Sequence, residues 1–377
     1  MKSENSLSEV AKLFSKLGVI TFGGAVAHIA MMQKEIVHKR QWMNEEHFLD
    51  LMGATNLIPG PNSTEMAMHI GHERAGWKGL IVAGSCFIFP AFIITLFFAW
   101  LYKQYGQLPQ IQPFIYGIKP TIIAVILASV YPLAKKVLKT VTLRILGIAA
   151  LMLCLAGYNE IIVMFGAGFI ALFLAYFQNK KPGTFVVRIF PFTFLQVSNS
   201  TLLSISNVNL FFTFLKIGAV LYGGGYVLFA FLDAELVAKG ILSRQQLIDA
   251  IAVGQFTPGP ITSAVTFIGY QINGFTGAVV SSIGIFLPSF LFVALLNPLV
   301  PKIRNSKLFS AFLDAINVAS IAIIVTVCYQ MGKEGITDWR TILIAIVSLF
   351  LSFGFRKING ALLILGGSLI GYLLSFV

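Results

Sequence analysis

Charged side chains are scarce in this 377-residue chain: Asp, Glu, Lys and Arg make up 11% of it, against 57% hydrophobic residues. About a quarter of the residues in an ordinary soluble domain are charged, so the composition excludes that class. Apolar runs at 80–101, 114–133 and 278–296 are each long enough for a bilayer-crossing helix of roughly 20 residues. The polar–apolar alternation of a transmembrane β-barrel is missing. The composition therefore predicts an all-α polytopic membrane protein.

The chain also has few cysteines, and Cys86, Cys154 and Cys328 each lie in a different apolar run. Their spacing matches neither a metal site nor a disulfide framework, so we expect no metal. No nucleotide-binding glycine loop is present, so ATP is not the driving force that this chain supplies, and no cofactor is implied. The apolar runs lack a paired acid and base, a nucleophile or a metal cluster, which argues against an enzyme. The polar N-terminus shows no cleavable signal pattern.

Acidic residues are fewer than basic ones, 15 against 27, and the formal net charge is +12. Such a balance can indicate nucleic-acid binding. Here, however, the basic residues cluster in short loops beside the apolar runs, which is the positive-inside pattern of membrane proteins. We therefore expect the lipid bilayer as the environment and no nucleic acid as a partner.

What the chain does contain is an internal repeat. Its first copy carries Phe14-Ser15-Lys16-Leu17-Gly18, Phe22-Gly23-Gly24, Pro59-Gly60-Pro61 and Pro90. About 200 residues later come Phe214-Leu215-Lys216-Ile217-Gly218, Tyr222-Gly223-Gly224, Pro258-Gly259-Pro260 and Pro288. A duplicated half in an apolar chain is typical of transporters built from two structural repeats. We predict an N-terminal repeat over residues 1–177, a linker over 178–208 and a C-terminal repeat over 209–377.

The distribution of basic residues predicts how the repeats are oriented. The first apolar helix is expected over residues 8–32. If each Pro-Gly-Pro segment enters and leaves on one side, each repeat has about five crossings, and the second repeat is inverted. Most basic loops then face the cytoplasm, and both termini face away from it. If these segments cross fully, each repeat has six spans and the repeats are parallel, which fits the charge bias poorly. Inverted repeats with broken or re-entrant helices are therefore the prediction.

The Pro-Gly-Pro motifs are the strongest local signal. Proline cannot continue a helix interior, so each motif breaks a helix and frees backbone groups. In a bilayer such groups are tolerated only inside protein or beside a water-filled cavity. Polar side chains follow each motif at the start of the next helix, where N–H groups and the positive end of the helix dipole favour an anion. The alternative is a plain proline kink; two matching copies favour a substrate site. Its predicted residues are Asn56, Pro59, Gly60, Pro61, Asn62, Ser63 and Thr64, with Gln255, Pro258, Gly259, Pro260, Thr262 and Ser263 in the second copy.

Two lysines and two glycine pairs occupy equivalent places in the repeats. Lys16 and Lys216 each interrupt an apolar run, and an ionisable residue in a membrane segment predicts a functional role. Two such cations would suit a divalent anion; the alternative is that Lys16 only reaches water from a helix end. The glycine pairs, Gly23-Gly24 and Gly223-Gly224, either let helices pack closely or break a helix so that backbone approaches the substrate.

Three residues are candidates for proton coupling. Glu65 follows the first Pro-Gly-Pro motif, and its counterpart in the second repeat is Ala264, so a role for Glu65 would be asymmetric. His69 lies further along the same segment and titrates near neutral pH; a solvated helix end is the alternative. Asp314 is a carboxylate inside an apolar run of the second repeat.

Taken together, these motifs resemble the chromate ion transporter family in its long, two-domain form. The resemblance covers both halves and includes a later pair of motifs, Gly76-Trp77-Lys78-Gly79 and Gly274-Phe275-Thr276-Gly277. It places the family's motif residues at the lysines, glycine pairs and Pro-Gly-Pro motifs named above. Asn56 and Gln255 are expected to face the cavity.

The resemblance implies secondary active transport of chromate or a related tetrahedral oxyanion. It further implies efflux driven by the proton motive force, across the cytoplasmic (inner) membrane of a bacterium or archaeon. Sulfate is a dianion of similar shape, so a sulfate or other anion transporter or channel stays open, and a non-transporting scaffold or sensor is a further alternative. The protein would act as a monomer or homodimer.

Overall fold

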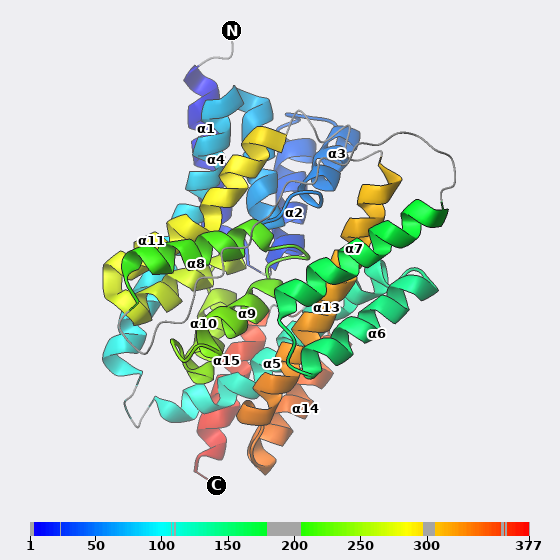
Figure 1. Ribbon diagram of the computed structural model, residues 1–377. Helices are drawn as coiled ribbons and strands as arrows, with labels where there is room; N and C mark the ends of the chain where they lie inside the picture. The colour runs from blue at the N-terminus through cyan, green and yellow to red at the C-terminus, as the bar shows by residue number, and fades with distance from the viewer. Residues whose placement is uncertain are drawn as a thin grey trace.

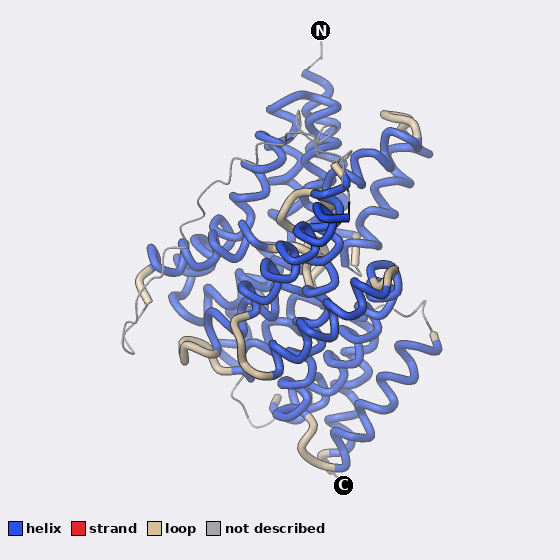
Figure 2. The backbone as a smooth tube through the Cα atoms, turned by 45° about the vertical axis from the view of Figure 1, so that its right-hand side comes forward, coloured by secondary structure: helices blue, strands red, loops and turns tan. Residues whose placement is uncertain are grey.

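The computed structural model describes residues 4–22, 24–106, 108, 111–178, 205–296, 306–355, 358 and 360–376. Helices joined by short loops make up nearly all of this described chain, and it contains no strand (Figure 2). The all-α fold predicted from composition is confirmed. Most of the predicted linker, residues 179–204, and the predicted site residue Gly23 lie outside the described residues.

The helices of the two repeats occur in the same order. Those of the first are α1 (Glu4–Ile20), α2 (Gly24–Gln33), η1 (Lys34–Lys39), α3 (Glu45–Thr55), α4 (Asn62–Tyr105), α5 (Gln112–Val137), α6 (Val141–Leu155) and α7 (Glu160–Gln178). Those of the second are α8 (Asn207–Val220), α9 (Val227–Leu232), η2 (Asp233–Val237), α10 (Arg244–Phe256), η3 (Ile261–Ser263), α11 (Ala264–Leu296), α13 (Lys307–Gly335), α14 (Trp339–Gly354) and α15 (Gly360–Leu374).

Helices long and apolar enough to cross a membrane number five in the described chain. They are Asn62–Tyr105, Gln112–Val137, Glu160–Phe177, Ile261–Leu295 and Leu308–Gly335. Shorter apolar helices cover Val141–Leu155, Asn207–Val220, Trp339–Gly354 and Gly360–Leu374. The protein is therefore a multi-pass membrane protein, as predicted.

Local capping signals set corresponding helix starts in the two repeats. The side chain of Asn44 accepts a hydrogen bond from the His47 backbone N–H at the start of α3. At the same place in the second repeat, Ser243 caps α10 and forms a capping box with Gln246. Both caps supply an acceptor to N–H groups that have no partner within the helix.

Glycines fold α4 and α11 back on themselves. Gly76 has φ +63° and ψ −150°, and Gly274 has φ +64° and ψ −150°, a conformation open to glycine alone. On either side of the first turn, Gly71 and Gly79 approach so closely that a Cβ on Gly79 would lie 2.0 Å from the Gly71 carbonyl oxygen. Gly269 and Gly277 repeat this contact in α11. The Gly-x-x-Gly motifs therefore encode a tight helical turn.

The helix expected over residues 8–32 is broken, because α1 ends at Ile20 and α2 begins at Gly24. Arg74 Nη2 lies 2.8 Å from Glu9 Oε2, and its guanidinium also lies over the Trp42 ring, 4.9 Å from the centroid. The start of α1 and the segment after α2 thus lie beside the turn of α4 at Gly76 (Figure 1). We call this end of the molecule the Arg74 end. Hence α1 and α2 form a helical hairpin. The described start of α1 lies at the same end as the charged segment after α2, whereas the sequence predicted it at the opposite end.

The segment containing the first Pro-Gly-Pro motif is also a helical hairpin. His47 at the start of α3 lies 3.5 Å from Glu73, which is close to the Gly76 turn. Both ends of this hairpin are therefore at the Arg74 end, and its tip is the Pro-Gly-Pro motif.

The second repeat is inverted relative to the first. Its glycine turn, at Gly274, lies beside the far end of α4: Gln271 donates to the Ala99 carbonyl at 3.0 Å, and Lys103 lies over the Tyr270 ring. Asn273 hydrogen-bonds Asn207 at the start of α8. The two glycine turns are thus at opposite ends of the long arm of α4, residues 77–105. We call these ends the Arg74 end and the Lys103 end. The inversion predicted from charge is present in the arrangement of helices.

We expect Gly79→Ala to destabilise the protein, because overpacking of this kind costs roughly 1–3 kcal/mol. Gly332 in α13 has no atom within 4 Å of an added Cβ, so Gly332→Ala is the matched control. The melting temperature of the detergent-purified protein should fall for the first variant and hold or rise for the second. Equal stability of the two variants would contradict the close contact.

Candidate functional site

Each Pro-Gly-Pro motif forms the tip of a helical hairpin. Pro61 and Pro260 adopt extended conformations immediately before the helices that start at Asn62 and Ile261. Between the prolines, Gly60 has φ +147° and Gly259 has φ +87°, which L side chains rarely adopt. Proline ends one helix, glycine redirects the chain, and the following residues begin the next helix.

The tips bind the opposite repeat through the backbone. The Gly60 N–H donates to the carbonyl of Leu221 at 2.7 Å, and the Gly259 N–H donates to the carbonyl of Thr21 at 2.9 Å. Leu221 and Thr21 are equivalent residues, each immediately after the first helix of its repeat. Four helix breaks, two from each repeat, therefore meet at the centre of the molecule.

The polar residues after each motif are buried at this junction. Ser63, Thr64, Thr262 and Ser263 are at most 3% exposed. Thr95 of α4 donates to Ser263 at 3.3 Å, across the boundary between the repeats. The hydroxyls of Thr64 and Thr262 have no hydrogen-bond partner among the described residues. The junction thus offers unpaired hydroxyls beside two helix N-termini, where an anion's oxygens would be stabilised.

Amide side chains flank the junction unequally. Asn62 donates to Asn56 Oδ1 at 2.9 Å, and Asn56 in turn donates to the Met52 carbonyl. Asn56 is exposed, whereas Gln255, its counterpart, is buried and its Nε2 has no partner among the described residues. The expectation that these amides face a cavity stays a prediction.

The glycine pairs lie at the breaks that follow α1 and α8. Gly24 has φ +77°, Gly223 φ +86° and Gly224 φ +100°. A Cβ on Gly24 would lie 3.3 Å from Ile261 Cδ1, directly after the second Pro-Gly-Pro motif. Of the two roles that the sequence left open for the glycine pairs, these residues favour the broken helix.

The two predicted lysines lie against glutamates that follow the α2 and α9 helices. Lys16 Nζ is 3.7 Å from Glu35, and Lys216 bonds Glu235. Lys39 and Lys239, one turn beyond each glutamate, complete the two clusters. The lysine side chains are 52% and 42% exposed, while the glutamates are buried. Sequence reasoning missed these partners, although Glu–Lys spacing of i to i+4 occurs in both repeats.

These cations lower the pKa of both glutamates. The hydrogen bond from Lys39, with the charges of Lys16 and Arg40, holds the pKa of Glu35 below its usual range. Burial raises the pKa of Glu235, but the hydrogen bonds and charges of Lys216 and Lys239 outweigh it, so the net shift is downward. Both carboxylates are therefore ionised at neutral pH.

The proton-coupling candidates occupy different places. Glu65 is fully buried one turn after the first Pro-Gly-Pro motif, and His69 is buried one turn further along the same helix. Asp314 is half-buried in α13, next to Ala315, which packs in a cluster with Leu143 and Ala171 of α6 and α7. Of the three candidates, only Glu65 is at the junction of the breaks.

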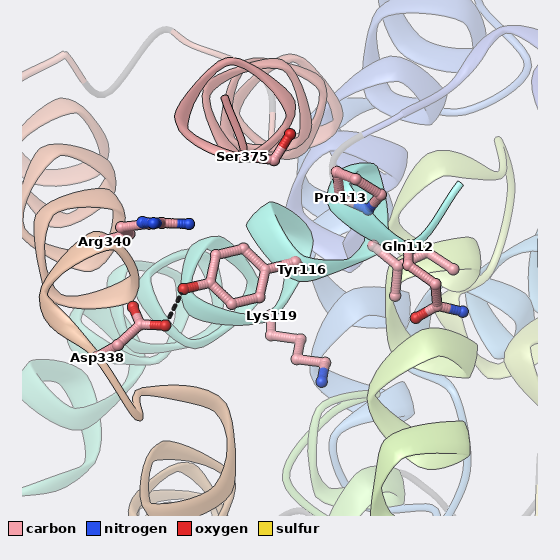
Figure 3. A pocket seen from close by; sticks show the side chains of 8 residues that line it. Gln112, Pro113, Tyr116, Lys119, Asp338, Arg340 and Ser375 are labelled. Carbon is pink, nitrogen blue, oxygen red and sulfur yellow. Dashed lines mark hydrogen bonds between the residues drawn. The ribbon is translucent and has the colours of Figure 1, made fainter. Parts of the chain in front are cut away.

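Cavities lie at both ends of the molecule. The larger, 340 Å³, is at the Lys103 end and is lined by residues of α5, α14 and the C-terminus. There Tyr116 lies between Lys119 and Arg340 and donates to Asp338 (Figure 3). The smaller, 240 Å³, is at the Arg74 end, beside Trp42 and His47. Neither of these two cavities is lined by residues of the Pro-Gly-Pro motifs. No group of three metal-ligating side chains occurs in the described chain.

Sequence comparison identifies the family of this chain. The profile of the chromate transporter family matches residues 8–172 and again residues 208–372. The chain belongs to this family. The chromate transport protein of Cupriavidus metallidurans is 29% identical, over 97% of this chain and 92% of its own length. A probable chromate transport protein of Synechococcus elongatus is 29% identical over 93% and 91%. The chromate transport protein of Pseudomonas aeruginosa is 25% identical over 96% and 90%. No solved structure matches the chain.

The family match covers both repeats and therefore both Pro-Gly-Pro hairpins. The family profile thus matches the chain twice, once on each side of residues 173–207. The family is one of transporters.

We expect Gly60→Ala to abolish function. An added Cβ would lie 2.1 Å from Glu65 Oε1 and 2.2 Å from Ser289 Oγ, and φ +147° is strained for alanine. Gly53, one helix earlier, has open space around it and serves as control. Anion uptake by proteoliposomes should be lost for Gly60→Ala and kept for Gly53→Ala. Normal uptake by Gly60→Ala would show that the tip is not fixed as described.

The lysine–glutamate clusters predict a pH-dependent stability. Because the folded pKa of Glu235 lies below its unfolded value, its ion pairs stabilise the protein above the ordinary carboxyl pKa. That stabilisation is lost as the pH falls through the lowered pKa. Glu235→Gln should therefore lower the melting temperature at pH 7, by an amount that shrinks toward acid pH. Glu46→Gln, at an exposed position, is the control; a gap that does not depend on pH would rule out the ion pairs as its cause.

Proposed function

We propose that the protein is a secondary active transporter that carries chromate or a related tetrahedral oxyanion out of the cytoplasm, driven by the proton motive force. One observation carries this proposal: two helix N-termini with unpaired hydroxyls meet at the boundary of two inverted repeats. Family membership and relatives named chromate transport proteins support the same substrate. Transporters with inverted repeats bind their substrates at such a boundary.

The anion would lie between the helices that begin at Asn62 and Ile261. Their N–H groups and the hydroxyls of Ser63, Thr64, Thr262 and Ser263 would hydrogen-bond its oxygens. These donors suit an oxyanion because each is neutral and fixed, and the dipoles of both helices stabilise negative charge. The amides of Asn56, Asn62 and Gln255 and the backbone at the glycine pairs, including Gly23, would complete the site.

Lys16 and Lys216 would supply the positive charge. Each is part of a cluster in which two or more cations surround one glutamate, so each cluster keeps net positive charge. The clusters belong to hairpins that begin at opposite ends of the molecule. A dianion would meet one cluster on its way in and the other on its way out.

Alternating access would arise from movement of one repeat against the other. The reciprocal bonds of Gly60 and Gly259 join the repeats at the junction, so small rotations about it would open one end at a time. We assign the Arg74 end to the cytoplasm, because Lys34, Lys39, Arg40, Arg74 and Lys78 gather there. The α1–α2 hairpin, its counterpart α8–α9 and the two Pro-Gly-Pro hairpins would then be re-entrant in the inner membrane of a bacterium or archaeon.

Transport by purified protein tests this proposal. In inside-out proteoliposomes, we expect saturable uptake of labelled chromate that an imposed proton gradient accelerates. Labelled sulfate and sulfate competition, in parallel vesicles, would show whether the site accepts other tetrahedral dianions.

Site variants locate the substrate. Lys16→Ala and Thr262→Ala should each remove most uptake while the protein stays in the membrane, because one removes charge and the other a donor. Lys12→Ala, a cation earlier on α1, is the matched control. Full uptake by both site variants would refute the site, and uptake of neither anion by the unmodified protein would refute the oxyanion function.

A further inference from the structure

The two Pro-Gly-Pro tips share a backbone geometry but differ in their chemical surroundings. A Cβ on Gly60 would meet the Glu65 carboxyl and the Ser289 hydroxyl, whereas one on Gly259 would meet the Ala91 methyl at 2.9 Å. By the repeat register, Ala91 is the counterpart of Ser289, and Ala264 is the counterpart of Glu65. The polar pair at one tip is thus replaced by an alanine pair at the other.

Tyr222 is a third polar residue at this tip whose counterpart in the other repeat is apolar. Tyr222 directly follows Leu221, whose carbonyl accepts the Gly60 N–H. Its counterpart in the first repeat is Phe22, which lacks the hydroxyl. Two polar side chains and a tyrosine next to the backbone contact of this tip therefore all have apolar counterparts in the other repeat. Anion-binding hydroxyls, by contrast, occur at both tips, so this cluster has a task that is needed once.

The Glu65 carboxyl is enclosed without a compensating cation. The side chain is 0% exposed and forms no ion pair among the described residues. Its polar neighbour across the boundary is Ser289 of α11, which is also 0% exposed. Tyr222, of the α8–α9 break, follows the residue whose carbonyl accepts the Gly60 N–H. His69 is the next titratable group on its own helix. An isolated carboxylate is costly to bury, so a group in this place gains or loses its proton when its access to water changes.

The cluster also spans the moving boundary. Glu65 belongs to the first repeat, and Ser289 and Tyr222 belong to the second. Any rotation of one repeat against the other must change the contact of the carboxyl with the Ser289 hydroxyl. The protonation of Glu65 and the relative position of the repeats are therefore coupled through direct contact.

We propose that Glu65, held beside Ser289 at the boundary between the repeats, is the residue that carries the coupling proton. The carboxylate takes one proton from water while the junction is open to one end of the molecule. The neutral acid is enclosed as the repeats close on it, and the proton passes to water when the other end opens. This assignment rests on the proposed function, since a coupling proton requires a transported anion.

The test separates coupling from transport. Glu65→Gln keeps the shape of the neutral acid but cannot release a proton. In proteoliposomes, this variant should exchange labelled for unlabelled anion without a gradient, yet gain no acceleration from an imposed proton gradient. Glu46→Gln, on the same hairpin and exposed, should behave as the unmodified protein in both assays.

The outcomes are distinct. Gradient-accelerated uptake by Glu65→Gln would overturn the assignment while leaving the transport function intact. Loss of exchange in a variant that still unfolds cooperatively would also overturn it, because Glu65 would then serve binding. Absence of exchange by the unmodified protein would instead refute the transport function itself.

A second variant keeps the test valid if Glu65→Gln fails to fold. Ser289→Ala removes the neighbouring hydroxyl and should shift the pH at which gradient-driven uptake is half-maximal. Ser281→Ala removes another buried hydroxyl of α11, whose oxygen has no partner among the described residues, and should leave that midpoint unchanged. An unshifted midpoint in Ser289→Ala would overturn the assignment.

Discussion

The reciprocal hydrogen bonds between the repeats are the constraint on which the rest of the structure depends. Gly60 binds the carbonyl of Leu221, and Gly259 binds the carbonyl of Thr21. A helix break exposes backbone groups, and in the interior of a membrane protein each needs a partner within the protein. Each repeat thus supplies a hydrogen-bond acceptor for the tip of the other.

This exchange explains why glycine and proline concentrate at the same places in both halves. The tips need glycine for their φ angles, and α1 and α8 need Gly18 and Gly218 to approach α4 and α11. A Cβ on Gly18 would lie 2.7 Å from the Phe87 carbonyl oxygen, and one on Gly218 would lie 2.4 Å from that of Ile285. Close packing without side chains is a common basis of helix association in membranes. The repeated motifs thus build one symmetric skeleton around the centre.

The polar groups placed on that skeleton are partly symmetric and partly not. The hydroxyls after the Pro-Gly-Pro motifs and the lysine–glutamate clusters occur in both repeats, whereas the Glu65, Ser289 and Tyr222 group occurs once. Duplication supplies two equivalent positions, and substitution at one of them can then add a new chemical property without disturbing the backbone. In the proposed mechanism, a carrier that binds one anion between two halves would use both kinds of position.

The sequence by itself determined the helical membrane class, the two repeats, their inversion and the helix breaks at the Pro-Gly-Pro motifs. Composition, internal similarity, loop charge and proline chemistry act locally or along the chain, so they can be read without a fold. Only the tertiary structure decided that residues 8–32 turn back as a hairpin, that Lys16 and Lys216 lie against Glu35 and Glu235, and that Glu65 meets Ser289. These features depend on contacts between residues far apart in the chain, and no local pattern of apolar or polar residues specifies which distant partner a side chain will meet.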